Sequence, residues 1–495
     1  MHDDGRVPSG LATALVLLTS AAVLVLEVLV TRLVAPYVGL TLETYTAAIG
    51  VALAGIAAGA ALGGRLADVV DPRRWLGPLT ALGGALLLAA RPTVFLLGPG
   101  LFGGAIGTII LVGAAVGPSV VVLSAVAPGV VKLRLRTLAE TGTTVGRLSA
   151  LGTLGGLAGT FLTGFVLLSA LPTSRILLLT GLLLVVVGVA LAVALPRREG
   201  PPEAAPLLAG LAVAALSASW LLTSDGPCER ETRYYCAGVV TDPSRESGRT
   251  LVLDGLRHSY VDLDDPSYLD FSYTQRMGDV MATLPDGPLD ALHLGLGGGT
   301  LPRHLAAVRP GSRSRVLEVD PGVLAIDRER LGLVTGPDLE VVVGDARTSV
   351  ADEPEDAYDV VVGDAFGSLA VPWHLTTREM VEDVRRVLRP DGVYVLNVID
   401  NPPSRFVRAE TATLREAFDD VVLLGTDEQA RGEIGGNYVL VASDAPLDRQ
   451  RLAELASARG ASDTAHETEA FAAGAQVLTD DDAPVDQLLT PFDQR

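Results

Sequence analysis

Seven apolar runs, each close to the length of a bilayer-crossing helix, fill the first 223 residues. A helix needs about 20 mainly apolar residues to cross the hydrocarbon core. The runs lie at about 11–34, 44–64, 75–90, 101–131, 148–171, 176–195 and 206–223. Backbone polar groups in lipid need internal partners, so residues 1–223 are predicted to form a multi-pass α-helical membrane domain in the lipid bilayer, with about seven transmembrane helices.

Basic residues between these runs fall mainly in alternate loops. They are Arg65, Arg73 and Arg74; Lys132, Arg134, Arg136 and Arg147; and Arg197 and Arg198. Short loops rich in Lys and Arg stay in the cytoplasm, which predicts a cytoplasmic side for these loops and for the N-terminus. An odd number of crossings then places residues 224–495 outside the cytoplasm, attached to the cell membrane.

Two charged residues, Glu27 and Arg32, lie inside or at the edge of the first run. A charge within a membrane is costly and is usually paired or functional. One interpretation is a functional pair. The other is a structural pair near the outer interface, with the Arg32 side chain reaching toward water.

The two halves of the chain differ in charge. Residues 1–223 hold 13 Lys and Arg against 9 Asp and Glu, which leaves 25 against 49 for residues 224–495. The second half has no evident basic patch for phosphates, so a nucleic-acid partner is not expected. With Lys132 as the single lysine, this acidity is typical of halophilic proteins, and a high-GC genome with an acidic bias is the alternative explanation.

A glycine-rich turn follows an apolar strand in the second half. Residues 291–294 run into Gly295-Leu296-Gly297-Gly298-Gly299-Thr300, and Glu318 closes the next strand about 20 residues later. Glycines allow close approach to a ligand, and an acid at this distance accepts hydrogen bonds from ribose hydroxyls. Two further apolar strands run into Asp345 and Asp364. Three carboxylates therefore meet at the sheet edge where α/β folds bind ligands.

Residues 286–495 are predicted to form an α/β domain with a seven-stranded, Rossmann-like sheet of the methyltransferase type. The expected strands lie at about 291–295, 315–319, 340–344, 358–363, 393–398, 420–425 and 437–443. The expected helices lie at about 300–308, 321–331, 376–388 and 405–417. Residues 224–285 are predicted to be a linker followed by a small β segment.

The only cysteines, Cys228 and Cys236, follow the last apolar run. A disulfide between them would suit an extracytoplasmic position, and two free thiols are the alternative. Two cysteines without nearby histidines cannot complete a zinc shell, so no metal site is expected.

Several motifs of the second half together resemble spermidine synthase and related polyamine aminopropyltransferases. They are Leu253-Asp254-Gly255, Tyr273 with Met277, the glycine turn, Glu318-Val319-Asp320, Gly344-Asp345, Asp364 and residues 478–484. The whole chain is similar to membrane-fused spermidine-synthase-like proteins.

The resemblance implies roles for the residues at the sheet edge. Gly295, Gly297, Gly298 and Gly299 would lie under a nucleoside, Glu318 would hold its ribose, and Asp345 would face its adenine. Asp364 would help orient and deprotonate an attacking amine. The co-substrate would be decarboxylated S-adenosylmethionine or S-adenosylmethionine, with no tightly bound cofactor, and the family's association through the soluble domain makes a homodimer an expectation.

Two positions depart from the family on the acceptor side. Where the synthases carry aspartates that hold a cationic acceptor, this chain has Thr300 and Gly367. Each missing anchor corresponds to about 1–3 kcal/mol, which disfavours putrescine. Tyr273 and Thr300 remain candidate acceptor-side residues. So do His258, which replaces a family glutamine, and His374, a candidate base beside Asp364. The alternative for His258 is a surface histidine, and the alternative for His374 is a structural role.

The leading hypothesis is therefore a membrane-anchored transferase that moves an aminopropyl or related group from an S-adenosylmethionine-type donor to an amine or other acceptor. A second hypothesis is an enzyme acting on a lipid or a membrane-tethered protein at the outer face, for example in lipoprotein modification. A third is a transporter or a non-catalytic nucleoside-binding module.

Overall fold

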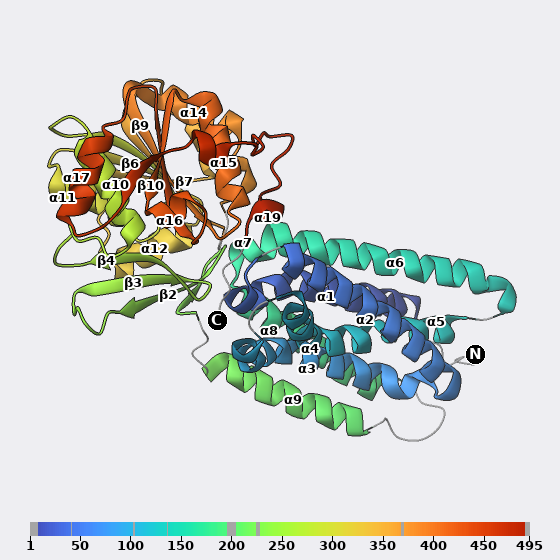
Figure 1. Ribbon diagram of the computed structural model, residues 1–495. Coiled ribbons are helices and arrows are strands. Elements are labelled where there is room, and N and C mark those ends of the chain that lie inside the picture. The colour runs from blue at the N-terminus through green and yellow to red at the C-terminus, as the bar shows by residue number, and fades with distance from the viewer. Residues whose placement is uncertain are drawn as a thin grey trace. The chain divides into compact units, whose positions relative to one another are not determined.

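The computed structural model describes residues 8–40, 42–101, 104–135, 137–195, 204–223, 228–367 and 371–490. The chain divides into two compact units, Met1–Arg233 and Tyr234–Arg495, which Figure 1 colours along the sequence. Arg136, Arg197 and Arg198, used above to assign cytoplasmic loops, lie outside the described residues.

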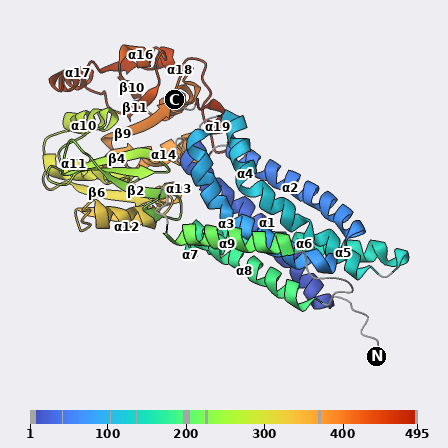
Figure 2. The ribbon, with the colours of Figure 1, turned by 90° about the horizontal axis from the view of Figure 1, so that it is seen from below.

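The first unit is helical, and its long helices run beside one another in Figure 2. Its elements are α1 (Ser9–Val38), α2 (Leu42–Val69), α3 (Pro72–Leu97), η1 (Gly98–Gly100), α4 (Gly104–Ser124), α5 (Val126–Arg134), η2 (Leu138–Glu140), α6 (Thr141–Phe161), the π-helix η3 (Leu162–Leu167), α7 (Leu168–Ala170), α8 (Thr173–Ala194), α9 (Ala204–Thr223) and the short strand β1 (Arg230–Glu231).

Glycines let the helices of this unit pack closely. A Cβ added at Gly155 of α6 would lie 2.5 Å from the carbonyl oxygen of Leu17 on α1, and one added at Gly159 would lie 2.6 Å from that of Ala21. Lipid tails are as apolar as leucine side chains, so membrane helices associate through such close backbone packing. The pattern fits helices packed within a bilayer.

Six helical segments among the described residues are long and apolar enough to cross a membrane. They are Ser9–Val38, Leu42–Val69, Pro72–Gly100, Gly104–Arg134, Thr141–Ala170 and Thr173–Ala194. The seventh predicted span corresponds to α9, whose apolar stretch Leu207–Thr223 is shorter. The predicted extracytoplasmic position of the second unit depends on an odd number of crossings. With six long apolar segments, that number is odd only if α9 also crosses the membrane.

The second unit begins with an antiparallel β meander and continues as an α/β domain. Its elements are β2 (Cys236–Thr241), β3 (Gly248–Leu253), β4 (Leu256–Asp262), α10 (Ser272–Thr283), β5 (Asp290–Leu294), α11 (Thr300–Val308), β6 (Arg313–Glu318), α12 (Pro321–Arg330), β7 (Leu339–Val343), α13 (Ala346–Ala351), β8 (Tyr358–Gly363), η4 (Trp373–Leu375), α14 (Arg378–Val387), β9 (Leu388–Asp400), α15 (Arg405–Ala417), β10 (Asp420–Gly425), α16 (Asp427–Ala430), β11 (Gly436–Ser443), α17 (Arg449–Ala458), β12 (Thr464–Glu467), α18 (Glu469–Ala472) and α19 (Val485–Leu488).

The main sheet has the strand order β12-β10-β11-β9-β8-β5-β6-β7. Strands β5 to β9 run parallel, whereas β10, β11 and β12 pair antiparallel with their neighbours. The Rossmann-like methyltransferase type of sheet agrees with the prediction, but the number of strands was wrong. The eighth strand, β12, is four residues long and polar, so it gave no apolar pattern from which to predict it.

Both faces of this sheet are covered by helices, because its strands bury alternate residues on opposite sides. On β8, Val361 packs in one core with α14 and α15, whereas Val360 and Val362 pack in the other core with α10 and α11. Figure 1 shows these two pairs of helices on opposite sides of the sheet. The carboxyl ends of the parallel strands are left for the loops that build the site.

Candidate active site

A cavity of about 890 Å³ lies at the carboxyl ends of the parallel strands of the second unit. The glycine turn, the ends of β6 and β8, and residues of β9 and β11 line it, including Glu318, Asp345, Asp364, Asn397 and Asn437. The three carboxylates predicted at this sheet edge therefore border one cavity. Its volume is typical of sites for small molecules and cofactors.

The glycine turn lies directly beside the backbone of Asp364. Gly295 has a φ of +97°, and a Cβ at this position would lie 2.7 Å from the Asp364 carbonyl oxygen. Only glycine fits such a position without strain. Gly295 and Gly297 line the cavity, whereas Gly298 and Gly299 are not among the lining residues, and Gly299 is the N-cap of α11.

Glu318 ends β6, and only 6% of it is exposed. One carboxylate oxygen accepts from the Leu296 backbone N–H (2.9 Å) and the other from the Asp320 backbone N–H (2.8 Å). Burial raises the pKa of Glu318 to about 7, although these backbone hydrogen bonds lower it. Ionised carboxylates offer about four acceptor positions, so some capacity remains for ligand hydroxyls.

Asp345 follows β7 and caps α13 by accepting from the Arg347 backbone N–H (2.9 Å). Its other carboxylate oxygen lies 3.3 Å from Nε2 of His374, which also lines the cavity. This contact places His374 on the predicted adenine side of the site. The predicted position of His374 was beside Asp364 instead.

Asp364 is held from two elements. Its Oδ2 accepts from the Tyr273 hydroxyl of α10 (3.2 Å), and its Oδ1 accepts from Nδ2 of Asn397 in β9 (2.9 Å). Burial raises the pKa of Asp364 to about 6, and the two hydrogen bonds limit that rise. A carboxylate poised near neutrality and fixed in orientation suits a general base.

Tyr273 and Thr300 both border the cavity, but their hydroxyl groups already have protein partners. Tyr273 contacts Asp364, as described above. The Thr300 hydroxyl donates to the Tyr260 carbonyl (2.8 Å) and pairs with the Ser259 hydroxyl (2.8 Å). Thr300 therefore ties the start of α11 to β4, which leaves its hydroxyl little capacity for an acceptor substrate.

His258 of β4 lines the cavity, and its Nε2 is buried with no hydrogen-bond partner among the described residues. Burial lowers the pKa of its ring to about 4, so the imidazole is neutral at physiological pH. Its position favours a ligand-facing role over a surface role.

Glu27 and Arg32 are five residues apart on α1, which puts their side chains about 140° apart around the helix. The Arg32 guanidinium donates to the backbone carbonyls of Thr232 (2.9 Å) and Arg233. The predicted pair is therefore not supported by helix geometry, because the two side chains belong to different faces. Cys228 and Cys236 are both disulfide-bonded.

Tyr235, Asn397 and Asn437 are among the cavity-lining residues that the sequence prediction missed. Tyr235 donates from its hydroxyl to the Phe366 carbonyl (2.7 Å), next to Asp364. Asn397 interrupts the apolar run of β9 just as acids end the neighbouring strands, and this pattern was a usable signal. Within the described residues, no group of three or more His, Cys, Asp or Glu is arranged to hold a metal ion.

Known proteins match mainly the second unit. The family described as methyltransferase domain matches residues 292–396. A polyamine aminopropyltransferase of Vibrio vulnificus (strain CMCP6) is 30% identical over 166 residues, which cover 33% of this chain and 53% of that protein. Polyamine aminopropyltransferase 2 of Streptomyces coelicolor (strain ATCC BAA-471 / A3(2) / M145) is 31% identical over 304 residues, 56% of this chain and 53% of that protein.

A solved structure, that of a probable spermidine synthase from Corynebacterium glutamicum ATCC 13032, is 26% identical, with a TM-score of 0.48, and the match covers 53% of this chain and 98% of that one. The chain spans about half the length of the first curated relatives it matches. Spermidine-synthase-like homologues thus cover its C-terminal part, and its six apolar helices are compatible with a membrane fusion. Several of these relatives are named polyamine aminopropyltransferases.

Proposed function

We propose that the second unit transfers an aminopropyl or related group from an S-adenosylmethionine-type donor to an acceptor amine. The observation that carries this proposal is Asp364, a carboxylate at the edge of the cavity, beside the glycine turn, with two hydrogen-bond donors fixing its orientation. A nucleoside held on the turn would bring its reactive carbon close to this base. The polyamine aminopropyltransferase relatives agree with this reaction class.

The donor would lie between the glycine turn and the acids of β6 and β7. Gly295 and Gly297 leave room for the nucleoside, and Glu318 has lone pairs left for the ribose hydroxyls. Asp345 would accept from the adenine amino group. Both S-adenosylmethionine and its decarboxylated form share this nucleoside, so the shared part of the donor accounts for these contacts.

In the transfer step, the nitrogen lone pair of the acceptor attacks the carbon next to the sulfonium. The new C–N bond forms as the C–S bond breaks. The electron pair of the C–S bond stays on the sulfur, which leaves as a neutral thioether. Asp364 takes the proton that the nitrogen loses. Because the leaving group needs no acid, alignment of the partners and one proton transfer account for the catalysis required of the protein.

The acceptor that we propose has one amine and a largely uncharged body. Asp270 also lines the cavity, and it is paired with Arg257 at 3.1 Å. Thr300 and Gly367 add no negative charge there. A free diamine would leave its second ammonium group without an anionic partner.

A lipid or a membrane-tethered protein at the outer face is the second candidate acceptor. The disulfide-bonded cysteines favour it, because disulfides persist mainly outside the cytoplasm. Cleavage by protease added to intact cells would test this location. If the second unit is cut only after the membrane is opened, the outer-face version is wrong.

The full chain in detergent micelles at high salt is the material for the direct test. S-adenosylmethionine, decarboxylated S-adenosylmethionine and methylthioadenosine are titrated against the wild type, Glu318→Ala and Asp364→Asn. We expect nucleoside binding that Glu318→Ala loses and Asp364→Asn keeps, with turnover lost in Asp364→Asn. Binding without any Asp364-dependent turnover would indicate a sensor or transporter module, and no binding of any nucleoside would refute the proposed donor.

A further inference from the structure

A continuous chain of hydrogen bonds lies behind Asp364. Asn397 donates to Asp364 and accepts at its own Oδ1 from Nδ2 of Asn437 in β11 (3.0 Å). The direction of these bonds is consistent, because an ionised Asp364 can only accept. The orientation of the Asn397 amide therefore depends on where Asn437 is held.

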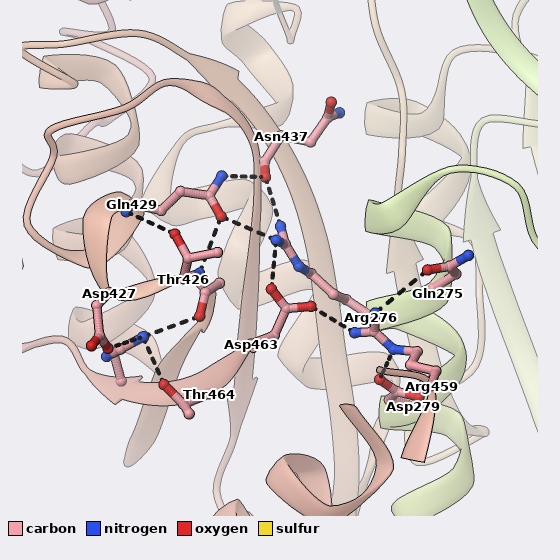
Figure 3. A network of polar contacts seen from close by, with 12 residues as sticks. Gln275, Arg276, Asp279, Thr426, Asp427, Gln429, Asn437, Arg459, Asp463 and Thr464 are labelled. Carbon is pink, nitrogen blue, oxygen red and sulfur yellow. Dashed lines mark hydrogen bonds and ion pairs between the residues drawn. The ribbon is translucent and has the colours of Figure 1, made fainter. Parts of the chain in front are cut away.

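The backbone carbonyl of Asn437 lies beyond the end of the neighbouring strand. The pairing of β10 with β11 reaches only to Leu424 opposite Val439. In place of a strand partner, the Asn437 carbonyl accepts from Nη1 of Arg276 (3.0 Å) and from Nε2 of Gln429 (3.1 Å). Figure 3 shows this carbonyl facing the two donors while the Asn437 side chain points away from them.

Arg276 is in turn fixed by a buried ionic network, drawn in Figure 3. Only 6% of Arg276 is exposed, and its Nη2 donates to Asp463 (2.8 Å) and to Gln429 (3.1 Å). Asp463 also accepts from Arg459 (2.7 Å), which itself donates to Asp279 (2.8 Å). A planar guanidinium with several donors can join a carboxylate to a backbone carbonyl in a way that a lysine cannot.

We propose that Arg276 is a positioning residue for Asp364, acting through the Asn437 carbonyl and the Asn397 amide. Its role as an aid to catalysis depends on the proposed function, whereas its effect on Asp364 does not. Arg276 lies outside the lining of this cavity. It fixes the end of β11 so that the Asn397 donor stays on the carboxylate.

This role predicts that loss of Arg276 weakens the Asn397 hydrogen bond and makes Asp364 a weaker acid. A hydrogen bond to a charged group is among the stronger ones in proteins, so its loss should change the proton affinity of Asp364 by about tenfold. Tyr273 from α10 and Asn397 from β9 are the side chains that donate to Asp364.

The test needs no substrate. The thermal stability of the full chain is measured between pH 4 and 9 with Asp and with Asn at position 364, and the pH at which the two curves separate reports the protonation of Asp364. The same comparison of the Asp364 protein with Asp364→Asn is then repeated in the Arg276→Met background, in the milder Gln429→Met background and in the Arg386→Met background. Arg386 is a matched control, because it also donates to backbone carbonyls, those of Glu353 (2.8 Å) and Val350 (2.9 Å), away from the site.

We expect the pH at which the two stability curves separate to rise by about one unit in Arg276→Met and by less in Gln429→Met. In Arg386→Met this pH should stay the same. An unchanged separation in both Arg276→Met and Gln429→Met would overturn the proposal. If Arg276→Met fails to fold, Gln429→Met decides alone, since it leaves no unpaired buried charge. These outcomes stand whether or not the protein transfers an aminopropyl group, so failure of the proposed function is recognised separately.

Discussion

Asp364→Asn should make the protein more stable at neutral pH while it removes activity. The substitution keeps the shape of the side chain, and the amide oxygen still accepts one of the two hydrogen bonds that Asp364 receives from Tyr273 and Asn397. What disappears is a negative charge that the folded protein holds in a poorly solvated place.

The sign of the pH dependence follows from the direction of the pKa shift. Burial raises the pKa of Asp364 from 3.8 in a free side chain to about 6. Between these values the folded protein keeps the proton and the unfolded chain has lost it, so the free energy of unfolding falls as the pH rises. A pKa shift of about two units lowers the free energy of unfolding by at most about 3 kcal/mol above pH 6. Because Asp364 borders a water-accessible cavity, we expect a loss of about 1–3 kcal/mol.

Thermal unfolding of the full chain in detergent measures this difference. We expect Asp364→Asn to unfold roughly 2–10 °C above the wild type at pH 8, and at a temperature close to the wild type at pH 4. Turnover should fall by about 10²- to 10⁴-fold. The exposed Asp338 supplies a control, because Asp338→Asn should show no such pH-dependent difference. Lower stability of Asp364→Asn at pH 8, or the same difference at both pH values, would refute this account of Asp364.

Three further predictions concern the residues around Asp364. Tyr273→Phe removes a hydrogen bond that lowers the pKa of Asp364, so the rising limb of the pH–rate profile should move to higher pH; an unmoved limb would contradict this. Glu318→Gln should weaken nucleoside binding about tenfold at pH 8 and abolish the loss of affinity expected below pH 7, which calorimetric titration at several pH values would show. Gly295→Ala should cost at least about 1 kcal/mol of stability and abolish nucleoside binding, because it introduces strain at a φ of +97° and a clash with the Asp364 carbonyl; normal binding would argue against close approach of a ligand there.

The three carboxylates that the sequence predicted at the sheet edge share one property, which is that each lies at the end of a strand. Apolar runs locate the strands, parallel order brings their carboxyl ends together, and Glu318, Asp345 and Asp364 follow as neighbours of one cavity. Their chemistry required no knowledge of side-chain contacts. The six long apolar helices were predictable for a similar reason, since length and apolar content suffice to locate them.

The parts that were not predicted depend on contacts between distant segments. Arg276 meets Asn437 and Asp463, which lie 161 and 187 residues further along the chain, and no local pattern relates them. The placing of His374 beside Asp345 depends on how the loop after β8 folds back, which apolar periodicity does not describe. A spacing of five residues puts Glu27 and Arg32 on different faces of α1, and the role of these two charges stays a prediction.

Under the proposed function, Asp364 would both take the proton from the acceptor amine and determine which acceptors bind. An alkyl amine is protonated at neutral pH, so under the proposed function it would arrive as a cation and pair with the ionised Asp364 before giving up a proton there. Because Asp270 is paired with Arg257, and Thr300 and Gly367 carry no charge, Asp364 would be the carboxylate left for a cationic acceptor. One carboxylate can anchor one ammonium group. Rejection of a diamine would then come from the unpaired second charge, since desolvating a cation without a partner costs more than the cavity's apolar contacts return.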